Sequence, residues 1–431
     1  MLHVDGESTL LRVEAREWAV LEAADGTRDM EGIALAARRL GGHASALRVA
    51  QFLAGLESRG LLEEGPPDHH PTGVTLRARN VPEERPLEIL PDYAFDCDGR
   101  GGCCRFYATI LFGPNDLARA HAHVPDHSVG IVPTERLFTP SRGSAPTPIM
   151  VPTHRDGACG FLRGDGLCEI HRAGGLMAKP FGCVAFPLRM CDDGTAVRVS
   201  VATECRCVLR SAIVPGGDPV LPVGSTHVRD VPLLSGIDAL PEQVPLVGDR
   251  TLSRASVRGL FETMLDQLPV SDPAVWLWGA AAAIESGTPR KPTVAEVEPW
   301  MRALAEAARR RAARDGDWRS ANDVTLRSLR WIATTSLALL HGELLGALLA
   351  SPPVDTRVET FWVRANLWGY HDVADLGVVT MLRDRAVRLW LARAMPELAS
   401  ADVADPMFEQ PLAVVDVLMR GHGLSHYASD F

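Results

Sequence analysis

The stretch FDCDGRGGCCRFY, residues 95–107, concentrates thiols in a short polar segment. Three of its residues are cysteines, and two of these, Cys103 and Cys104, are adjacent. Glycines 99, 101 and 102 stand among them, and glycine readily adopts positive φ and lets backbone N–H groups point toward sulfur. A flexible turn that carries several thiols is typical of a metal site. In such a site four thiolates converge on a soft cation such as zinc, or on the irons of an iron–sulfur cluster.

The other cysteines of the chain gather around this stretch. All nine lie between positions 97 and 207 of the 431 residues, where an even scatter would place only about two. Structural core cysteines would be spread more widely. The candidate metal ligands are therefore Cys97, Cys103, Cys104, Cys159, Cys168, Cys183, Cys191, Cys205 and Cys207.

Adjacent thiols limit how such ligands can be shared. In an extended chain neighbouring side chains point to opposite faces, so Cys103 and Cys104 would not easily bind one ion unless a tight turn intervenes. Nine thiols can fill two four-ligand sites with one left over, or one site with five left over, and both arrangements stay open. An odd number of cysteines in a reducing compartment argues against a disulfide framework.

Two blocks of this window resemble a known family. CDGRGGCC at 97–104 is similar to the C-x2-C-G-x-C-C signature of the YkgJ-type cysteine-cluster proteins, and CGFLRGDGLCEIH with KPFGCVAFP, within 159–187, is similar to their second block. The Ile-His pair at 170–171 and the later Cys205 resemble the flagellin lysine-N-methylase branch in particular. The family resemblance implies a bound metal in the form of an iron–sulfur cluster, with zinc as the alternative. The methylase branch implies methyl transfer from S-adenosylmethionine to protein lysines.

Carried over residue by residue, the resemblance assigns metal binding to Cys97, Cys103, Cys104, Cys159, Cys168 and Cys183, with Cys205 as a further ligand. Arg100 stands where the signature has its second cysteine, so Cys191 or Cys207 would have to replace that ligand. Lys179 stands in place of the usual arginine before proline. The sequence contains neither a G-x-G-x-x-G loop between a strand and a helix nor a C-x3-C-x2-C triplet, so methyl transfer rests on the resemblance alone.

Residues 1–64 predict a small module of helices and short strands. DGTRDMEGIALAARRL at 25–40 places Ile33 on one apolar helical face, and a second helix capped by Ser45 places Leu53 on another. This pattern resembles a PqqD-type winged-helix domain, which implies that it captures a peptide by strand addition at a sheet edge. A winged helix without a ligand, serving solubility or dimerisation, is the alternative. Seven arginines against eleven acidic residues argue against duplex DNA as the ligand.

The remaining segments complete a mainly α (α+β) protein. Residues 65–94 are rich in proline and predict a linker, 95–213 a loop-rich cysteine-cluster metal-binding domain, 214–250 a second linker, and 251–431 a helical bundle with apolar residues at three- and four-residue spacing. LWGYHDVADL at 367–376 interrupts this spacing. It predicts an interhelical loop, with the lining of a pocket as the alternative.

Composition narrows the classes of function. A net charge of -10 argues against nucleic acid as the main partner. The N-terminus lacks the pattern of a secretory signal, and the apolar stretches 275–284 and 331–340 are shorter than the roughly 20 residues of a membrane span, so we expect a cytoplasmic protein without a membrane partner. The resulting hypothesis is metal-cluster-dependent modification of a peptide or protein substrate, with lysine methylation as one form. The alternative is a non-catalytic metal or redox sensor, or a zinc-stapled scaffold.

Overall fold

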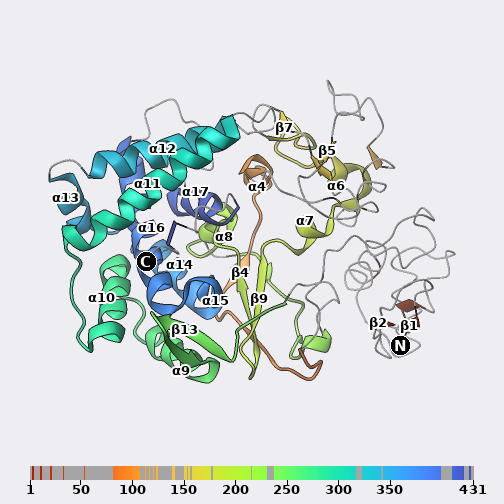
Figure 1. Cartoon of the computed structure of the whole chain (residues 1–431). Helices are drawn as coiled ribbons and strands as arrows, with labels where there is room; N and C mark the ends of the chain where they lie inside the picture. The colour runs from red at the N-terminus through yellow and green to blue at the C-terminus, as the bar shows by residue number, and fades with distance from the viewer. Residues whose placement is uncertain are drawn as a thin grey trace.

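A computed structural model describes a large part of the chain. The described residues are 2–3, 10–11, 20–21, 33, 53, 81–106, 112, 116, 120, 123–124, 138–140, 150–152, 154–155, 158–175, 178–214, 216–230, 237–316, 323–340, 343–398, 410–421 and 427–428. They form long helices and several small sheets, so the predicted mainly α (α+β) class is confirmed at this level (Figure 1).

Most of the winged-helix module predicted for residues 1–64 lies outside the described residues. Its described strands, β1 (Leu2–His3) and β2 (Leu10–Leu11), pair antiparallel. Ile33 and Leu53, expected on the apolar faces of two helices, are helical and buried. The PqqD-like fold of this module remains a prediction.

A four-stranded sheet lies in the middle of the described region (Figure 1). Its strands, in spatial order, are β12 (Ile237–Ala239), β9 (Leu188–Asp192), β10 (Val197–Val201) and β3 (Leu87–Ile89). β9 and β10 form an antiparallel pair, while β3 runs parallel to β10 and β12 runs parallel to β9. The sheet therefore joins segments that are far apart in the sequence.

Both segments predicted as linkers contribute strands to this sheet. β3 comes from the predicted linker 65–94 and β12 from the predicted linker 214–250, so at these two strands the chain belongs to the folded sheet. Strands of three residues are too short to show the alternation that predicts a strand. Prolines 86 and 91, on either side of β3, favoured a loop in the sequence.

β10 is buried on both of its faces. Val197 and Val199 pack in an apolar cluster on one face. On the other face, Ser200 Oγ donates a hydrogen bond of 2.8 Å to the carbonyl of Ala365, and the guanidinium of Arg198 lies over two aromatic rings. Alternating apolar and polar residues are typical of a strand with one solvent-exposed face. In β10, however, helices cover the polar face.

The cysteine-rich region consists of short elements, as its loop-rich sequence predicts. They are β4 (Ala94–Phe95), α4 (Gly102–Phe106), β5 (Phe138–Pro140), β6 (Met150–Pro152), β7 (His154–Arg155), β8 (Ala158–Cys159), α6 (Glu169–Gly174), α7 (Phe181–Ala185), α8 (Arg206–Ser211), β11 (Asp218–Pro219) and the 3-10 helix η3 (Val228–Asp230). Three pairs of strands, β4–β11, β5–β6 and β7–β8, form separate two-stranded sheets.

The C-terminal part is helical, as predicted from its apolar spacing. After the hairpin of β13 (Gln243–Val247) and β14 (Arg250–Ser253), its elements are α9 (Arg254–Leu265), α10 (Pro273–Ser286), α11 (Val294–Gly316), α12 (Asp323–Leu339), α13 (Leu344–Ala350), α14 (Thr356–Trp368), α15 (Val373–Leu376), α16 (Val378–Leu398), α17 (Pro411–Asp416) and the π-helix η5 (Val417–Gly421). α16 contacts α10, α11, α12, α13, α15 and α17 and therefore forms the centre of the bundle.

The apolar stretches 275–284 and 331–340 fall in α10 and α12, and many of their side chains lie in the main core. Within the described ranges, no single helix is long and apolar enough to cross a membrane. One bent pair, Ser328–Leu339 with Leu344–Ala350 at 101°, passes the same test of length and composition when its members are taken together.

The segment 367–376 forms the predicted turn between helices, and its Tyr370 and His371 are buried while Asp372 is half-buried. Tyr370 and Asp372 have φ values of 51° and 62°, which are strained for residues other than glycine. Arg385 donates a 2.5 Å hydrogen bond to Asp372. Burial, together with the positive charge of Arg189, holds the pKa of His371 well below its usual range, so this histidine is neutral in the folded protein.

Paired charges stabilise the centre of the bundle. Arg388, which is fully buried in α16, lies 2.9 Å from Asp416 and 2.7 Å from Asp384. Asp416 also accepts hydrogen bonds of 2.6 Å from Trp362 Nε1 and from Thr203 Oγ1. Because Thr203 follows β10, this carboxylate joins the sheet region to the helices.

Replacing Asp416 with alanine should destabilise the protein strongly, because Arg388 would keep only part of its compensation in a dry site. We expect the free energy of unfolding to fall by about 3–5 kcal/mol, measured by urea denaturation. The matched control is Glu298→Ala, which removes the partner of the exposed Arg302 on α11 and should cost about 0–1 kcal/mol. Equal losses in the two variants would contradict this role of the buried charges.

Candidate metal centre

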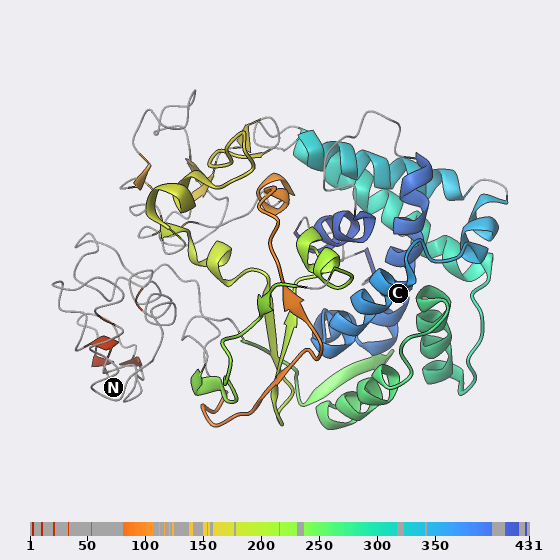
Figure 2. The ribbon, with the colours of Figure 1, turned by 180° about the vertical axis from the view of Figure 1, so that it is seen from behind.

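The sheet directs several cysteine-bearing segments toward one of its ends. β3 and β10 are parallel, so their carboxyl ends lie at the same end of the sheet, and β9 begins there because it is antiparallel to β10. Cys97 follows β3, Cys205 and Cys207 follow β10, and Cys183 precedes β9. Figure 2 shows the resulting arrangement, with β4 in orange next to α8 and α4 further along the same orange segment.

Close contact between two glycine-containing loops brings the two cysteine blocks together. Gly101, at φ +71°, precedes α4, and a Cβ on this residue would come within 2.4 Å of a Leu162 methyl group and 2.8 Å of the Gly166 carbonyl oxygen. A Cβ on Gly166, at φ +85°, would come within 3.0–3.3 Å of the backbone of Gly99 and Arg100. Only glycine permits this approach at these φ values.

Cys103 and Cys104 lie together on a helical turn, with their Sγ atoms 4.0 Å apart. The limit expected for neighbouring cysteines in an extended chain therefore does not apply, because α4 supplies the tight turn that would be needed. α4 contacts β8, which ends at Cys159, and Cys104 and Cys168 pack against the apolar cluster that contains Cys159.

Electrostatic coupling joins these thiols into one set around Lys179. We call it the five-thiol group, and its members are Cys103, Cys104, Cys159, Cys168 and Cys183. The hydrogen bond between the two adjacent thiols lowers the pKa of Cys103 and raises that of Cys104. Burial raises the pKa of Cys159 to about 12, and burial and then Cys159 raise the pKa of Cys183.

Lys179 interacts electrostatically with four members of the five-thiol group, Cys103, Cys104, Cys168 and Cys183. Burial lowers the pKa of this lysine, but its electrostatic interactions with four of the thiols outweigh burial and leave the pKa raised. The ammonium group therefore stays charged at neutral pH, and its positive charge favours thiolates over thiols.

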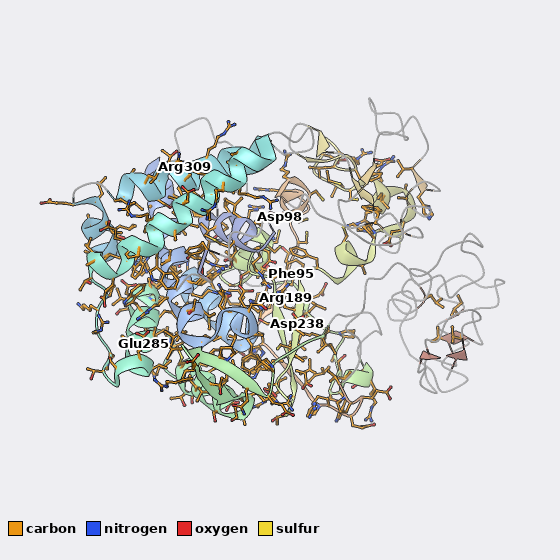
Figure 3. The ribbon with its side chains drawn as sticks, in the orientation of Figure 1. Phe95, Asp98, Arg189, Asp238, Glu285 and Arg309 are labelled. Carbon is orange, nitrogen blue, oxygen red and sulfur yellow. The ribbon has the colours of Figure 1, made fainter. Side chains whose placement is uncertain are left out.

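Cys97, Cys205 and Cys207 form a second set, the three-thiol group, at the start of α8. Hydrogen bonding to Cys207, and then burial, raise the pKa of Cys97, while hydrogen bonding to Cys205 raises the pKa of Cys207 to about 12. Asp98 accepts a hydrogen bond of 3.2 Å from Cys207 Sγ and pairs with Arg206. Figure 3 labels Asp98, which lies in the segment between β4 and α4. Cys97 also interacts with Cys103 and Lys179, so the two groups are adjacent.

Cys191 lies apart from both groups. It occupies the middle of β9 opposite Arg198 and packs in the main core. Burial, and then the carboxylate of Asp238, raise its pKa to about 12. Of the two cysteines expected to substitute for the ligand replaced by Arg100, only Cys207 lies next to Cys97.

Within the described residues, no set of three or more His, Cys, Asp or Glu side chains is arranged to hold a metal ion. The thiols thus share a region without lying at the vertices of a coordination site. Their chemistry nevertheless fits a soft cation, because the five-thiol group consists of sulfur donors with one half-buried cation, Lys179, to offset negative charge. Comparisons with protein-family models, curated proteins and solved structures give no match.

Sequence reasoning missed two polar features of this region. Asp98 was not singled out, although it is an acidic residue inside the quoted stretch, directly after Cys97. The bonds that tether this segment to α8 were also missed: Arg210 donates a 2.7 Å hydrogen bond to Asp96, and the backbone N–H of Asp96 donates a 3.0 Å bond to Ser211 Oγ. These bonds join residues that are far apart in the sequence, so no local pattern indicates them.

Gly101→Ala should separate the two cysteine blocks, because its Cβ would clash with Leu162 and Gly166 while its backbone is held at positive φ. We expect reagents for thiols to label the buried Cys159 at least about tenfold faster than in the unmodified protein, as local opening becomes more frequent. The control is Gly164→Ala in the opposing loop, between Leu162 and Gly166, where a Cβ would meet no atom within 4 Å. Labelling at the same rate in both variants would show that this contact does not hold the blocks together.

Proposed function

We propose that the protein is a thiolate–metal protein with an iron–sulfur cluster that modifies a peptide or protein substrate. The observation that carries the metal part is the five-thiol group, in which thiols from α4, β8, α7 and the start of α6 interact electrostatically with one another and with Lys179. Thiolates are the ligands that irons of such clusters and zinc prefer. Unrelated buried cysteines would have no reason to gather in this way.

Cys103, Cys104, Cys159, Cys168 and Cys183 are the proposed ligands, and Cys97 and Cys207 are the nearest additional donors. A cluster bound there would supply electron transfer or polarisation of a substrate. The chain itself would contribute Lys179, which offsets the negative charge of thiolates, and Asp98, which orients Cys207 through their hydrogen bond.

The substrate part of the proposal rests on the two sequence resemblances. A PqqD-like module at 1–64 would dock a peptide, and the YkgJ-like window at 97–207 would act on it. The flagellin lysine-N-methylase branch makes methyl transfer from S-adenosylmethionine to a lysine side chain the specific reaction to test. That S-adenosylmethionine requirement belongs to the resemblance and not to any described residue.

A zinc-stapled scaffold is the second candidate. It is favoured by the packing of Cys104, Cys159 and Cys168 with the rings of Phe112 and Phe161, which gives these thiols an apolar environment typical of a structural site. A redox sensor without catalytic activity belongs to the same alternative class, since it too requires only the thiols.

Elemental analysis and visible absorption of protein purified without oxygen separate these candidates. We expect iron, acid-labile sulfide and broad visible absorption, and Cys104→Ser should lose most of the metal. Cys191→Ser is the matched control, because this cysteine lies in the sheet, and it should retain the metal. Zinc in a colourless sample would favour the scaffold, while equal metal content in both variants would refute the ligand assignment.

The same preparations test the enzymatic part. Incubation with S-adenosylmethionine and a peptide encoded by a neighbouring gene, followed by mass spectrometry, should show the mass of an added methyl group for the metal-loaded protein and none for Cys104→Ser. An unchanged peptide mass in the presence of intact metal would contradict this activity.

A further inference from the structure

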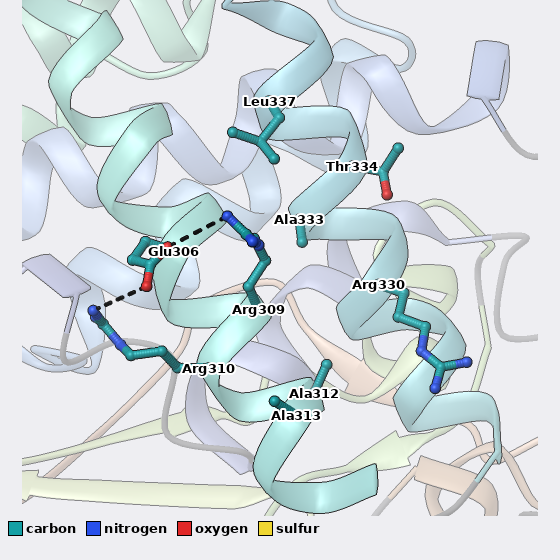
Figure 4. Close-up of a pocket in the computed structure, with 9 residues that line it drawn as sticks. All are labelled: Glu306, Arg309, Arg310, Ala312, Ala313, Arg330, Ala333, Thr334 and Leu337. Atoms are coloured by element: carbon teal, nitrogen blue, oxygen red, sulfur yellow. Dashed lines mark hydrogen bonds and ion pairs between the residues drawn. The ribbon is translucent and has the colours of Figure 1, made fainter.

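A groove of about 500 Å³ lies between α11 and α12, outside the cysteine-rich region (Figure 4). Small residues, Ala312, Ala313 and Ala333, form much of its lining, with Leu337 and Thr334 beside them. Its remaining lining residues are charged: Glu306, Arg309, Arg310 and Arg330. The groove therefore has a floor of small apolar side chains and a rim with an excess of basic residues.

The basic rim is poorly neutralised. Glu306 is the carboxylate partner of both Arg309 and Arg310, at 3.7 Å and 3.4 Å, and these distances exceed those of strong charge-assisted hydrogen bonds (Figure 4). Arg330, on α12, is exposed, and no partner for it is found among the described residues. Each guanidinium has five N–H donors, so three of them offer far more donors than one carboxylate can use.

Stabilisation of the helices does not explain this arrangement. Basic residues favour the last turn of a helix, but Arg309 and Arg310 lie before the last turn of α11, and Arg330 lies in the middle of α12. The exposed ion pairs along α11, such as Arg302 with Glu298, instead balance one charge with one charge. The protein as a whole has a net charge of -10, so the excess of positive charge at the groove is a local feature.

We infer that this groove binds an acidic segment of the peptide substrate. Guanidinium groups bind carboxylates with paired hydrogen bonds, and the alanine floor lets a peptide backbone approach the helices closely. A short peptide can contact the groove alone, whereas a long phosphate backbone would also meet the acidic remainder of the surface. α12 contacts α4, which carries Cys103 and Cys104, so a bound peptide would start close to the five-thiol group.

This inference rests on the proposed function for the identity of the substrate, but binding can be measured without turnover. Fluorescence anisotropy would compare a labelled peptide of glutamate, alanine and leucine with one in which glutamine replaces each glutamate. The full-length protein should bind the glutamate peptide at least about tenfold more tightly, since charge-assisted hydrogen bonds carry the difference. Raising the salt concentration should weaken that binding.

The double variant R309Q/R330Q should lose this preference, with affinity for the glutamate peptide reduced at least about tenfold and affinity for the glutamine peptide unchanged. The matched control is R302Q, on the same helix but outside the groove, which should bind as the unmodified protein does. Equal affinity for the two peptides, an equal loss in R302Q, or binding of inorganic polyphosphate without binding of the glutamate peptide would overturn the inference.

The outcomes also separate this inference from the proposed function. Normal metal content and peptide modification without any preference for glutamate would refute the groove alone. If the protein purified without oxygen contains no metal but still prefers the glutamate peptide, the proposed function is refuted and the groove remains as a docking surface.

Discussion

The close approach of the backbones at Gly101 and Gly166 is the contact on which the cysteine-rich region depends. No disulfide joins the two blocks of cysteines, and all nine thiols are free. The blocks are held by the docking of one loop on the other, at positive φ and at distances that exclude a Cβ. The same contact places α4 beside β8, and with it Cys103 and Cys104 beside Cys159.

The sheet supplies the second constraint. Because β3 and β10 are parallel and β9 is antiparallel to both, three chain segments that carry thiols emerge at one end of the sheet. The buried polar face of β10 fixes this sheet against the helices through Ser200, and Asp416 links Thr203 to the bundle. The thiols are thus positioned from one side by short loops and from the other by a rigid, buried sheet, a combination that suits a site whose ligands come from loops.

Local patterns in the sequence predicted what depends on local physics. The glycines around Cys103 indicated a tight turn, and α10, α11 and α16 followed from apolar residues at helical spacing. The sequence left open whether a tight turn intervenes at Cys103–Cys104, and the residues after Gly101 do form a helical turn. β3 was missed because a three-residue strand in a segment bounded by prolines carries no periodic signal.

Long-range order could not be predicted in the same way. The division of the cysteines into five, three and one follows from strand pairing, which places Cys191 on the sheet and Cys207 beside Cys97. In α16, Arg388 and Asp384 are buried because Arg388 pairs with Asp384 and with Asp416. Ion pairs of this kind cannot be predicted before it is known which distant residues lie together.

The most direct test of this account is to cross-link the thiols of the reduced, full-length protein with a short reagent that carries two thiol-reactive groups, and to map the products by peptide mass spectrometry. The account predicts links from Cys103 or Cys104 to Cys159, Cys168 or Cys183, and none to Cys191. Links confined to cysteines within one block, or links that involve Cys191 as often as the others, would contradict it.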